Sequence, residues 1–153
     1  MLIKKKIIIV ISLFLWFSTD LFAKEKDAEL ELFMELQSKI IDVSNQIKPV
    51  VIHIEAVQKK GGSKRRVLGS GLLLDKEGYI ITTEHLVTEA EDATVTMLDD
   101  TKKYDAKIIG IDKLTDLALL KIEHNKELKY PILGDSEGVQ VGEWVIAIGN
   151  PYG

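Results

Sequence analysis

The sequence contains no cysteine, and its 153 residues include only three prolines and three histidines. The lack of cysteine excludes disulfide bonds and thiolate catalysis. There is no excess of positive charge, with 20 basic against 24 acidic residues, which argues against nucleic-acid binding because the phosphate backbone selects for a basic face. The histidines are scattered and show no His-Glu-x-x-His spacing, so neither a metal site nor a cofactor is expected.

A single long hydrophobic run is present, near the N-terminus. Three lysines precede the apolar stretch Ile7–Phe17, and the small residue Ala23 lies before a charged segment. This order predicts a secretory signal peptide over residues 1–23, with cleavage after Ala23. The alternative is an uncleaved membrane anchor, but an anchor needs about 20 apolar residues, and Asp20 interrupts the run. We therefore expect export, without a stable membrane span.

Residues 24–48 are charged and have helical periodicity. Apolar residues recur at three- and four-residue steps and form one stripe, which consists of Phe33, Leu36, Ile40, Val43 and Ile47. Pro49 disfavours helical geometry at Lys48, so the amphipathic helix is predicted to end there. Packing on the following domain and contact with another subunit both explain such a stripe.

Residues 49–153 alternate short apolar runs with turns that contain Gly and Asp, without internal repeats or βαβ units. This spacing is typical of a barrel or sandwich, so the predicted fold class is all-β with one N-terminal helix. The run at 117–122 is apolar nearly throughout and is expected to be buried on both faces, whereas the basic stretch 58–66 is predicted to be a loop. Strands are predicted at residues 50–57, 72–74, 79–81, 94–98, 103–111, 117–122 and 144–148.

The hairpin predicted at residues 72–81 leads to a candidate general base. Its two apolar runs flank the turn-forming residues Asp75–Gly78, and His85 follows the second run. A histidine at the exit of a rigid hairpin is well held and can still face a cleft, as a general base requires. Without further context, a lone histidine after a strand is more often a surface or capping residue. His53 alternates with apolar residues in its strand and is interpreted as an outward residue without a catalytic role.

Three segments, in order, resemble the HtrA (Do/Deg) family of trypsin-like serine proteases over about residues 48–153. The resemblance implies that residues 49–153 form the first barrel of a double β-barrel, and that the second barrel is missing from this chain. His85 matches the family's general base, with departures at Glu84 and Leu86, and Asp116 matches the carboxylate that orients it. The segments are Thr83-Glu84-His85-Leu86-Val87, Thr115-Asp116-Leu117-Ala118-Leu119-Leu120 and Val141-Gly142-Glu143-Trp144-Val145-Ile146-Ala147-Ile148-Gly149-Asn150-Pro151-Tyr152-Gly153.

The third member of a catalytic triad is not found. The family's nucleophilic serine lies in a Gly-Asn-Ser-Gly-Gly turn of the second barrel, where backbone N–H groups form the oxyanion hole, and this sequence has no such turn. Ser136 fits a Gly-x-Ser-x-Gly pattern, but a nucleophile elbow needs a buried strand before the serine and a helix after it. Pro131 lies upstream and extended sequence follows, so we reject Ser136 as the nucleophile. The chain alone is expected to be inactive.

Three functions are compatible with these patterns. The resemblance implies the N-terminal part of an exported serine endopeptidase of the periplasm or cell envelope. Such a protease acts on unfolded or damaged envelope proteins, forms homotrimers and carries PDZ domains elsewhere. The alternative is a truncated, catalytically inactive protease-like module that binds through its barrel surface or its helix. A third hypothesis is an esterase that uses Ser136, which a Ser136→Ala substitution tests directly.

Overall fold

The structure is a computed structural model that describes residues 29–98, 100 and 102–150. The predicted signal peptide, residues 1–23, and residues 24–28 of the predicted helix lie outside the described residues. The chain divides into two units, Met1–Val43 and Ser44–Gly153.

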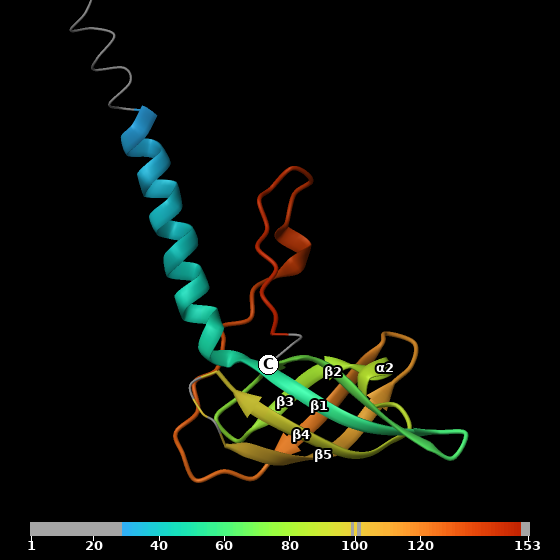
Figure 1. Cartoon of the computed structure of the whole chain (residues 1–153). Coiled ribbons are helices and arrows are strands. Elements are labelled where there is room, and N and C mark those ends of the chain that lie inside the picture. Colours follow the sequence, from blue (N-terminus) through green and yellow to red (C-terminus); the bar gives the residue numbers. More distant parts are fainter. Residues whose placement is uncertain (1–28, 99, 101, 151–153) are drawn as a thin grey trace, which may run out of the picture. The chain divides into compact units, whose positions relative to one another are not determined.

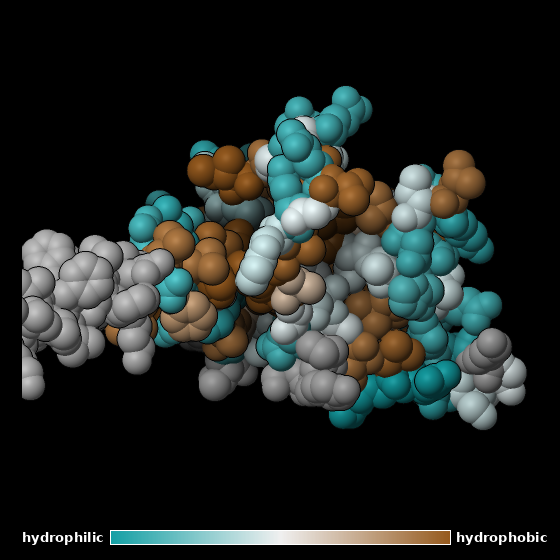
Figure 2. Space-filling model, turned by 90° about the horizontal axis from the view of Figure 1, so that it is seen from above, coloured by the Kyte–Doolittle hydropathy of each residue, from teal (hydrophilic) through white to brown (hydrophobic). Residues whose placement is uncertain are grey.

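The described part of the first unit, residues 29–43, is helical, and the same helix continues into the first residues of the second unit. The α-helix runs over residues 29–47 and is followed by the 3₁₀ turn η1 (Lys48–Val50), which has Pro49 in its first turn. An exposed ion pair of 2.9 Å joins Lys39 Nζ to Glu35 Oε1, one helical turn apart. Side chains of the predicted apolar stripe, among them Phe33 and Leu36, are exposed to solvent, and hydrophobic surface is visible on this helix in Figure 2. Among the described helices, none is both long and apolar enough to cross a membrane.

The second unit contains a closed barrel of antiparallel strands, which confirms the all-β prediction (Figure 1). Neighbouring strands follow the order β1-β2-β3-β6-β5-β4. A short helix, α2 (Glu84–Val87), follows β3 directly. The strands are β1 (Val51–Lys60), β2 (Ser63–Leu73), β3 (Tyr79–Thr83), β4 (Ala90–Met97), β5 (Lys103–Asp112) and β6 (Leu117–Ile122).

The predicted hairpin between residues 72 and 81 is confirmed by its register, in which Leu72 pairs with Ile81 and Leu73 with Ile80. Its turn depends on two local features. The Asp75 carboxylate accepts a hydrogen bond of 2.9 Å from the Glu77 N–H, and Gly78 adopts a positive φ of 91° that disfavours residues with a Cβ.

The predicted loop at residues 58–66 is wrong, because these residues extend β1 and β2 into a second hairpin. Gly61 and Gly62 both have positive φ, as a two-residue hairpin turn of type I′ requires. Three of the cations in this stretch, Lys59, Lys64 and Arg66, instead pair with carboxylates on the barrel. Glu91 on β4 contacts Lys59 and Lys64, at 3.1 and 2.8 Å between nitrogen and oxygen.

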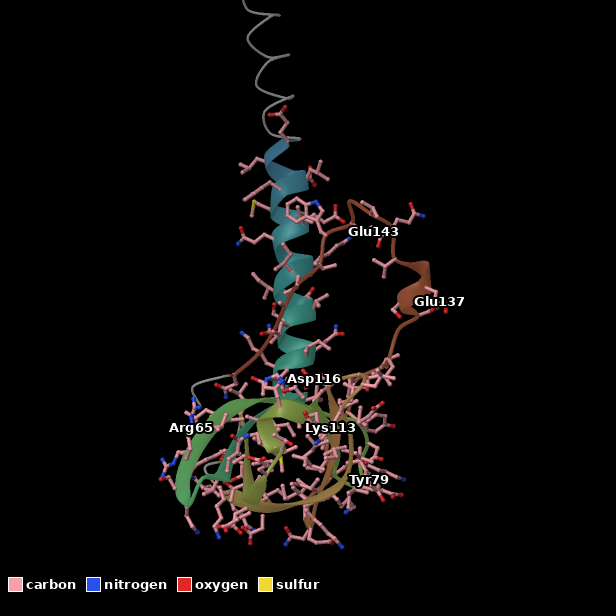
Figure 3. The ribbon with its side chains drawn as sticks, turned by 90° about the vertical axis from the view of Figure 1, so that its right-hand side faces the viewer. Arg65, Tyr79, Lys113, Asp116, Glu137 and Glu143 are labelled. Atoms are coloured by element: carbon pink, nitrogen blue, oxygen red, sulfur yellow. The ribbon has the colours of Figure 1, made fainter. Side chains whose placement is uncertain are left out.

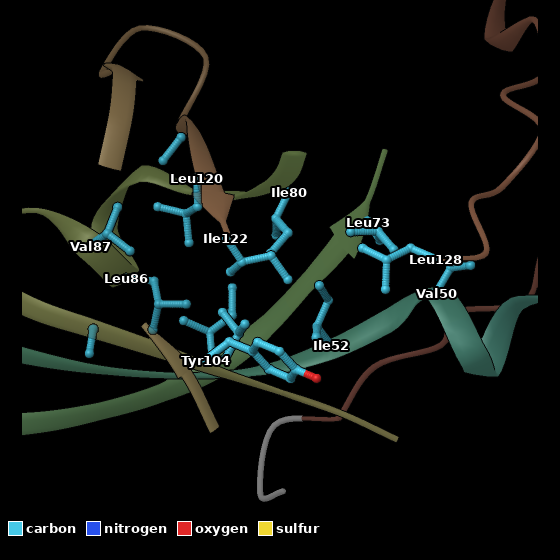
Figure 4. Close-up of a cluster of buried hydrophobic side chains, with 14 residues drawn as sticks. Val50, Ile52, Leu73, Ile80, Leu86, Val87, Tyr104, Leu120, Ile122 and Leu128 are labelled. Carbon is cyan, nitrogen blue, oxygen red and sulfur yellow. The ribbon is translucent and has the colours of Figure 1, made fainter. Parts of the chain in front are cut away.

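The core fills the interior of the barrel (Figure 4). Alternate residues of each strand point inward, and Ile54, Ile80, Leu120 and Ile122 are completely buried. The prediction that residues 117–122 are buried on both faces is wrong, since only Ala118, Leu120 and Ile122 of this strand are buried. A closed barrel has one interior, and the outward residues of β6 face away from it.

Residues 129–150 follow the barrel and contain one regular element, the 3₁₀ turn η2 (Ser136–Gly138). The strand predicted at 144–148 is not formed. A strand needs a partner for its backbone hydrogen bonds, and a closed barrel offers no free edge. Apolar side chains on this segment therefore stay exposed, including Trp144, whose relative exposure is 83%.

Candidate active site

The short helix α2 places His85 on the barrel. Its two apolar residues, Leu86 and Val87, are buried in the core of the barrel and hold the helix in place. The imidazole of His85 stays exposed. Close packing depends on Gly69 of β2, where an added Cβ would lie only 2.7 Å from Leu86 Cδ2. The absence of a side chain at Gly69 thus lets α2 approach the sheet.

The carboxylate of Asp116 lies against the imidazole of His85. His85 Nδ1 is 2.8 Å from Asp116 Oδ2 and 3.0 Å from Asp116 Oδ1. The backbone N–H of His85 also donates to Oδ1, at 3.1 Å. One carboxylate therefore binds both the side chain and the main chain of His85, which fixes the position of the ring as well as its orientation.

Asp116 holds this position through an unusual backbone conformation. It lies immediately before β6 with a positive φ of 56°, a region that Asp and Asn enter more easily than most residues and that is enriched at functional sites. Its carbonyl accepts a hydrogen bond of 3.0 Å from the Glu84 N–H. The preceding turn is held by Asp112, whose carboxylate accepts from the Leu114 N–H and the Thr115 hydroxyl, at 2.9 and 2.8 Å. Asp116 and Lys113, which both belong to this turn, are labelled in Figure 3.

These contacts make Asp116 a stable anion. The backbone N–H of His85, followed by its imidazole, holds the pKa of the Asp116 carboxyl below its ordinary value, because both donate hydrogen bonds to the charged form. A carboxylate only accepts hydrogen bonds, so the proton in the Nδ1 contact belongs to the imidazole. In the neutral ring, Nε2 is then the unprotonated nitrogen and can accept a proton.

A further residue, Gln58, supports α2, and no sequence pattern indicated this role. Gln58 of β1 donates from Nε2 to the carbonyls of His85 and Leu86, at 2.9 and 3.1 Å, which satisfies two backbone acceptors of this short helix. Glu84 is buried, and its Oε1 has no hydrogen-bond partner among the described residues. Gly69 could have been suspected from its Gly-Ser-Gly context, whereas Gln58 carried no signal.

The other residues considered from the sequence do not join this pair. Ser136 lies in η2 and is exposed, and Figure 3 shows its neighbour Glu137 well apart from Asp116. His53 faces outward from β1, as predicted, but it contacts the backbone of Asn150. Among the described residues, no group of three or more His, Asp or Glu side chains is placed to hold a metal ion.

The barrel and the His85–Asp116 pair agree with the comparison to known protein families. Residues 69–153 match the trypsin-like peptidase domain family. This match covers more than half of the chain, and the chain belongs to that family.

Within the family, the chain is similar to DegP-like periplasmic serine endoproteases. The relative from Bartonella henselae is 34% identical over 138 residues, which cover 90% of this chain and 27% of the relative. Relatives from Pseudomonas fulva and Chlamydia trachomatis are 46% and 43% identical over 61% and 63% of this chain, and 19% of each relative is covered. The HtrA resemblance and the predicted periplasmic localisation are confirmed by these relatives. The chain spans about a fifth to a quarter of their length.

Proposed function

We propose that this chain is the N-terminal part of an exported HtrA-like serine endopeptidase, in which His85 is the general base and Asp116 orients it. The observation that carries the proposal is the bond of 2.8 Å between His85 Nδ1 and Asp116 Oδ2, which joins α2 to the turn that precedes β6. The relatives named as serine endoproteases support it.

The pair has the properties that nucleophile activation requires. Asp116 fixes the ring with Nδ1 protonated, so Nε2 is available to take a proton from a serine hydroxyl and later return it to the leaving amine. The His85 side chain is 71% exposed, which leaves room for a nucleophile and a substrate to approach. When the imidazolium forms, the neighbouring anion stabilises it.

We propose that the nucleophilic serine and the oxyanion hole come from outside residues 1–153, because none of the seven serines lies in a Gly-Asn-Ser-Gly-Gly turn. The substrates would be unfolded or damaged proteins of the cell envelope, and the assembly a homotrimer. Residues 1–23 would direct export. The 153-residue chain by itself would then not hydrolyse peptide bonds.

Reaction with a serine-directed phosphonate tests the catalytic roles, because covalent labelling requires an activated serine. The protein should be expressed from its complete gene and compared with the 153-residue chain. We expect labelling of the former only. His85→Ala should slow labelling about 10⁶-fold, and Asp116→Asn about 10⁴-fold, since the wrong imidazole tautomer is then favoured.

His124→Ala and Ser136→Ala are matched controls, and both should label like the wild-type protein. Undiminished labelling of the His85→Ala variant would contradict the general-base role. Loss of labelling in Ser136→Ala would instead identify an esterase-like site at that serine. If the wild-type protein does not label at all, the inactive binding module becomes the better explanation.

A further inference from the structure

The outer face of the β1–β2 hairpin carries two polar side chains that face the same way. His53 and Ser70 are direct cross-strand partners in the antiparallel register, so their side chains lie on one side of the sheet and close together. Neither residue belongs to the His85–Asp116 site.

The sequence around both residues forces them outward. On β1, Ile52 and Ile54 on either side of His53 are buried in the core, so His53 points away from it. On β2, Ser70 is flanked by Gly69 and Gly71. An added Cβ at Gly71 would lie 2.7 Å from Ile54 Cδ1, so the inward positions beside Ser70 have no room for a side chain.

Both side chains bind the backbone of one distant residue, Asn150. The Asn150 N–H donates to Ser70 Oγ at 2.7 Å, and the Asn150 carbonyl lies 3.0 Å from His53 Nδ1, which donates to it. Asn150 thus has both of its backbone hydrogen-bonding groups satisfied by side chains, in place of the strand partner that a closed barrel cannot provide.

Local features prepare each side of this contact. The carbonyl of Ser70 accepts a bond of 2.8 Å from the hydroxyl of Thr82 on β3, which ties the Ser70 backbone to the next strand. On the other side, Pro151 follows Asn150 in the sequence, and a residue before proline is biased towards extended geometry. An extended residue directs its N–H and its carbonyl to the same side, where one pair of side chains can bind both.

We propose that His53 and Ser70 form a backbone clamp that fixes the chain at Asn150 on the outside of the barrel. Through these two hydrogen bonds, the barrel fixes the position of the chain at Asn150, the end of the segment that follows it. His53 and Ser70 are positioning residues that act through Asn150. This inference does not depend on the catalytic roles proposed above, because it concerns the order of Asn150 in this chain.

Backbone ¹⁵N relaxation of the 153-residue chain tests the clamp. In the wild-type protein, the order parameter of the Asn150 amide should be about 0.85, as in rigid backbone. In the His53→Ala/Ser70→Ala double variant, it should fall below about 0.6. Exchange of the Asn150 amide hydrogen should become roughly three- to tenfold faster in Ser70→Ala, since one net hydrogen bond is lost. Barrel amides such as Leu120 should keep their protection.

Conservative variants separate the clamp from a general structural role. Ser70→Thr keeps the hydroxyl acceptor and His53→Asn keeps an N–H donor near the position of Nδ1, so both should retain the order of Asn150. Ser136→Ala and His124→Ala are matched controls that should change nothing at Asn150. The clamp is contradicted if Asn150 is already mobile in the wild-type chain, or if it remains ordered in the double variant.

Discussion

The barrel and the segment that follows it are both rich in apolar residues, yet only the barrel buries them. Ile80 in β3 is completely buried, whereas Ile132 in the segment is 96% exposed. The strands of the barrel satisfy their backbone hydrogen bonds in a closed circle, and residues 129–150 have no place in it. Hydrophobicity therefore favours strand formation, but a partner edge decides whether a strand forms.

The largest expected effect comes from removing buried atoms. Ile80→Ala should lower the free energy of unfolding by about 2–5 kcal/mol, because it removes a buried side chain and leaves a cavity. The matched change Ile132→Ala should shift it by less than about 0.5 kcal/mol, as exposed substitutions do. Urea unfolding followed by circular dichroism measures both. An equal loss of free energy in the Ile132 variant would show that the side chain of Ile132 is buried. It would contradict the difference in burial between the barrel and residues 129–150.

A smaller effect is expected from filling space at a glycine. Gly71→Ala puts a Cβ 2.9 Å from Ile80 Cγ2 and 3.1 Å from the Ile81 carbonyl oxygen, so we expect destabilisation by about 1–3 kcal/mol. Gly134 lies in the segment, and an added Cβ there meets nothing within 4 Å. Gly134→Ala should be neutral or slightly stabilising, because alanine restricts the unfolded chain. Thermal unfolding of the two variants compares these positions. A destabilised Gly134→Ala variant would contradict the expectation that only Gly71 lacks room for a side chain.

Lowering the pH should also destabilise the barrel, and the loss in free energy of unfolding per carboxyl group should be smaller than that of either core substitution. Hydrogen bonds and neighbouring cations hold the pKa values of several carboxyls below the ordinary 3.8 for Asp and 4.5 for Glu; these are Glu55, Glu91, Asp100, Asp112 and Asp116. In each case the unfolded chain binds protons at a higher pH than the folded chain does. The stabilisation is therefore complete above these ordinary values and is lost as the pH falls through the lower folded-state values.

The expected result is a urea midpoint that is constant from pH 7 to about pH 5 and falls below about pH 4. Asp100 should account for much of this fall, because Lys126 Nζ and the Tyr104 hydroxyl both donate to its carboxylate, at 2.7 and 2.8 Å. Asp100→Asn should make the midpoint less dependent on pH. A urea midpoint that rises on acidification would contradict the lowered pKa values of these carboxyl groups in the folded protein.

Predictions from the sequence succeeded where structure depends on neighbouring residues. The hairpin at residues 72–81 was predictable because Asp75 and Gly78 make its turn locally. The end of the N-terminal helix, predicted at Lys48, was found within one residue because Pro49 acts on its neighbour. The basic hairpin was missed, since two of its lysines, Lys59 and Lys64, pair with Glu91 on another strand.

The candidate site shows the same division. Residue types and the family resemblance pointed to His85 and Asp116, but neither could reveal the positive φ of Asp116 or its two bonds to His85. Gln58 and Gly69 were not predicted as supports of α2, because their roles exist only after β1 and β2 pack beside that helix.

Alternating apolar residues and turn signals were enough to establish the fold class and most strands, because these patterns act over a few residues along the chain. Closure of the barrel decided the rest. It set which face of β6 is buried, left residues 144–148 without a partner strand, and brought Asp116 against His85 and Asn150 against Ser70. Contacts between residues this far apart in the sequence depend on how strands of different hairpins pair in three dimensions.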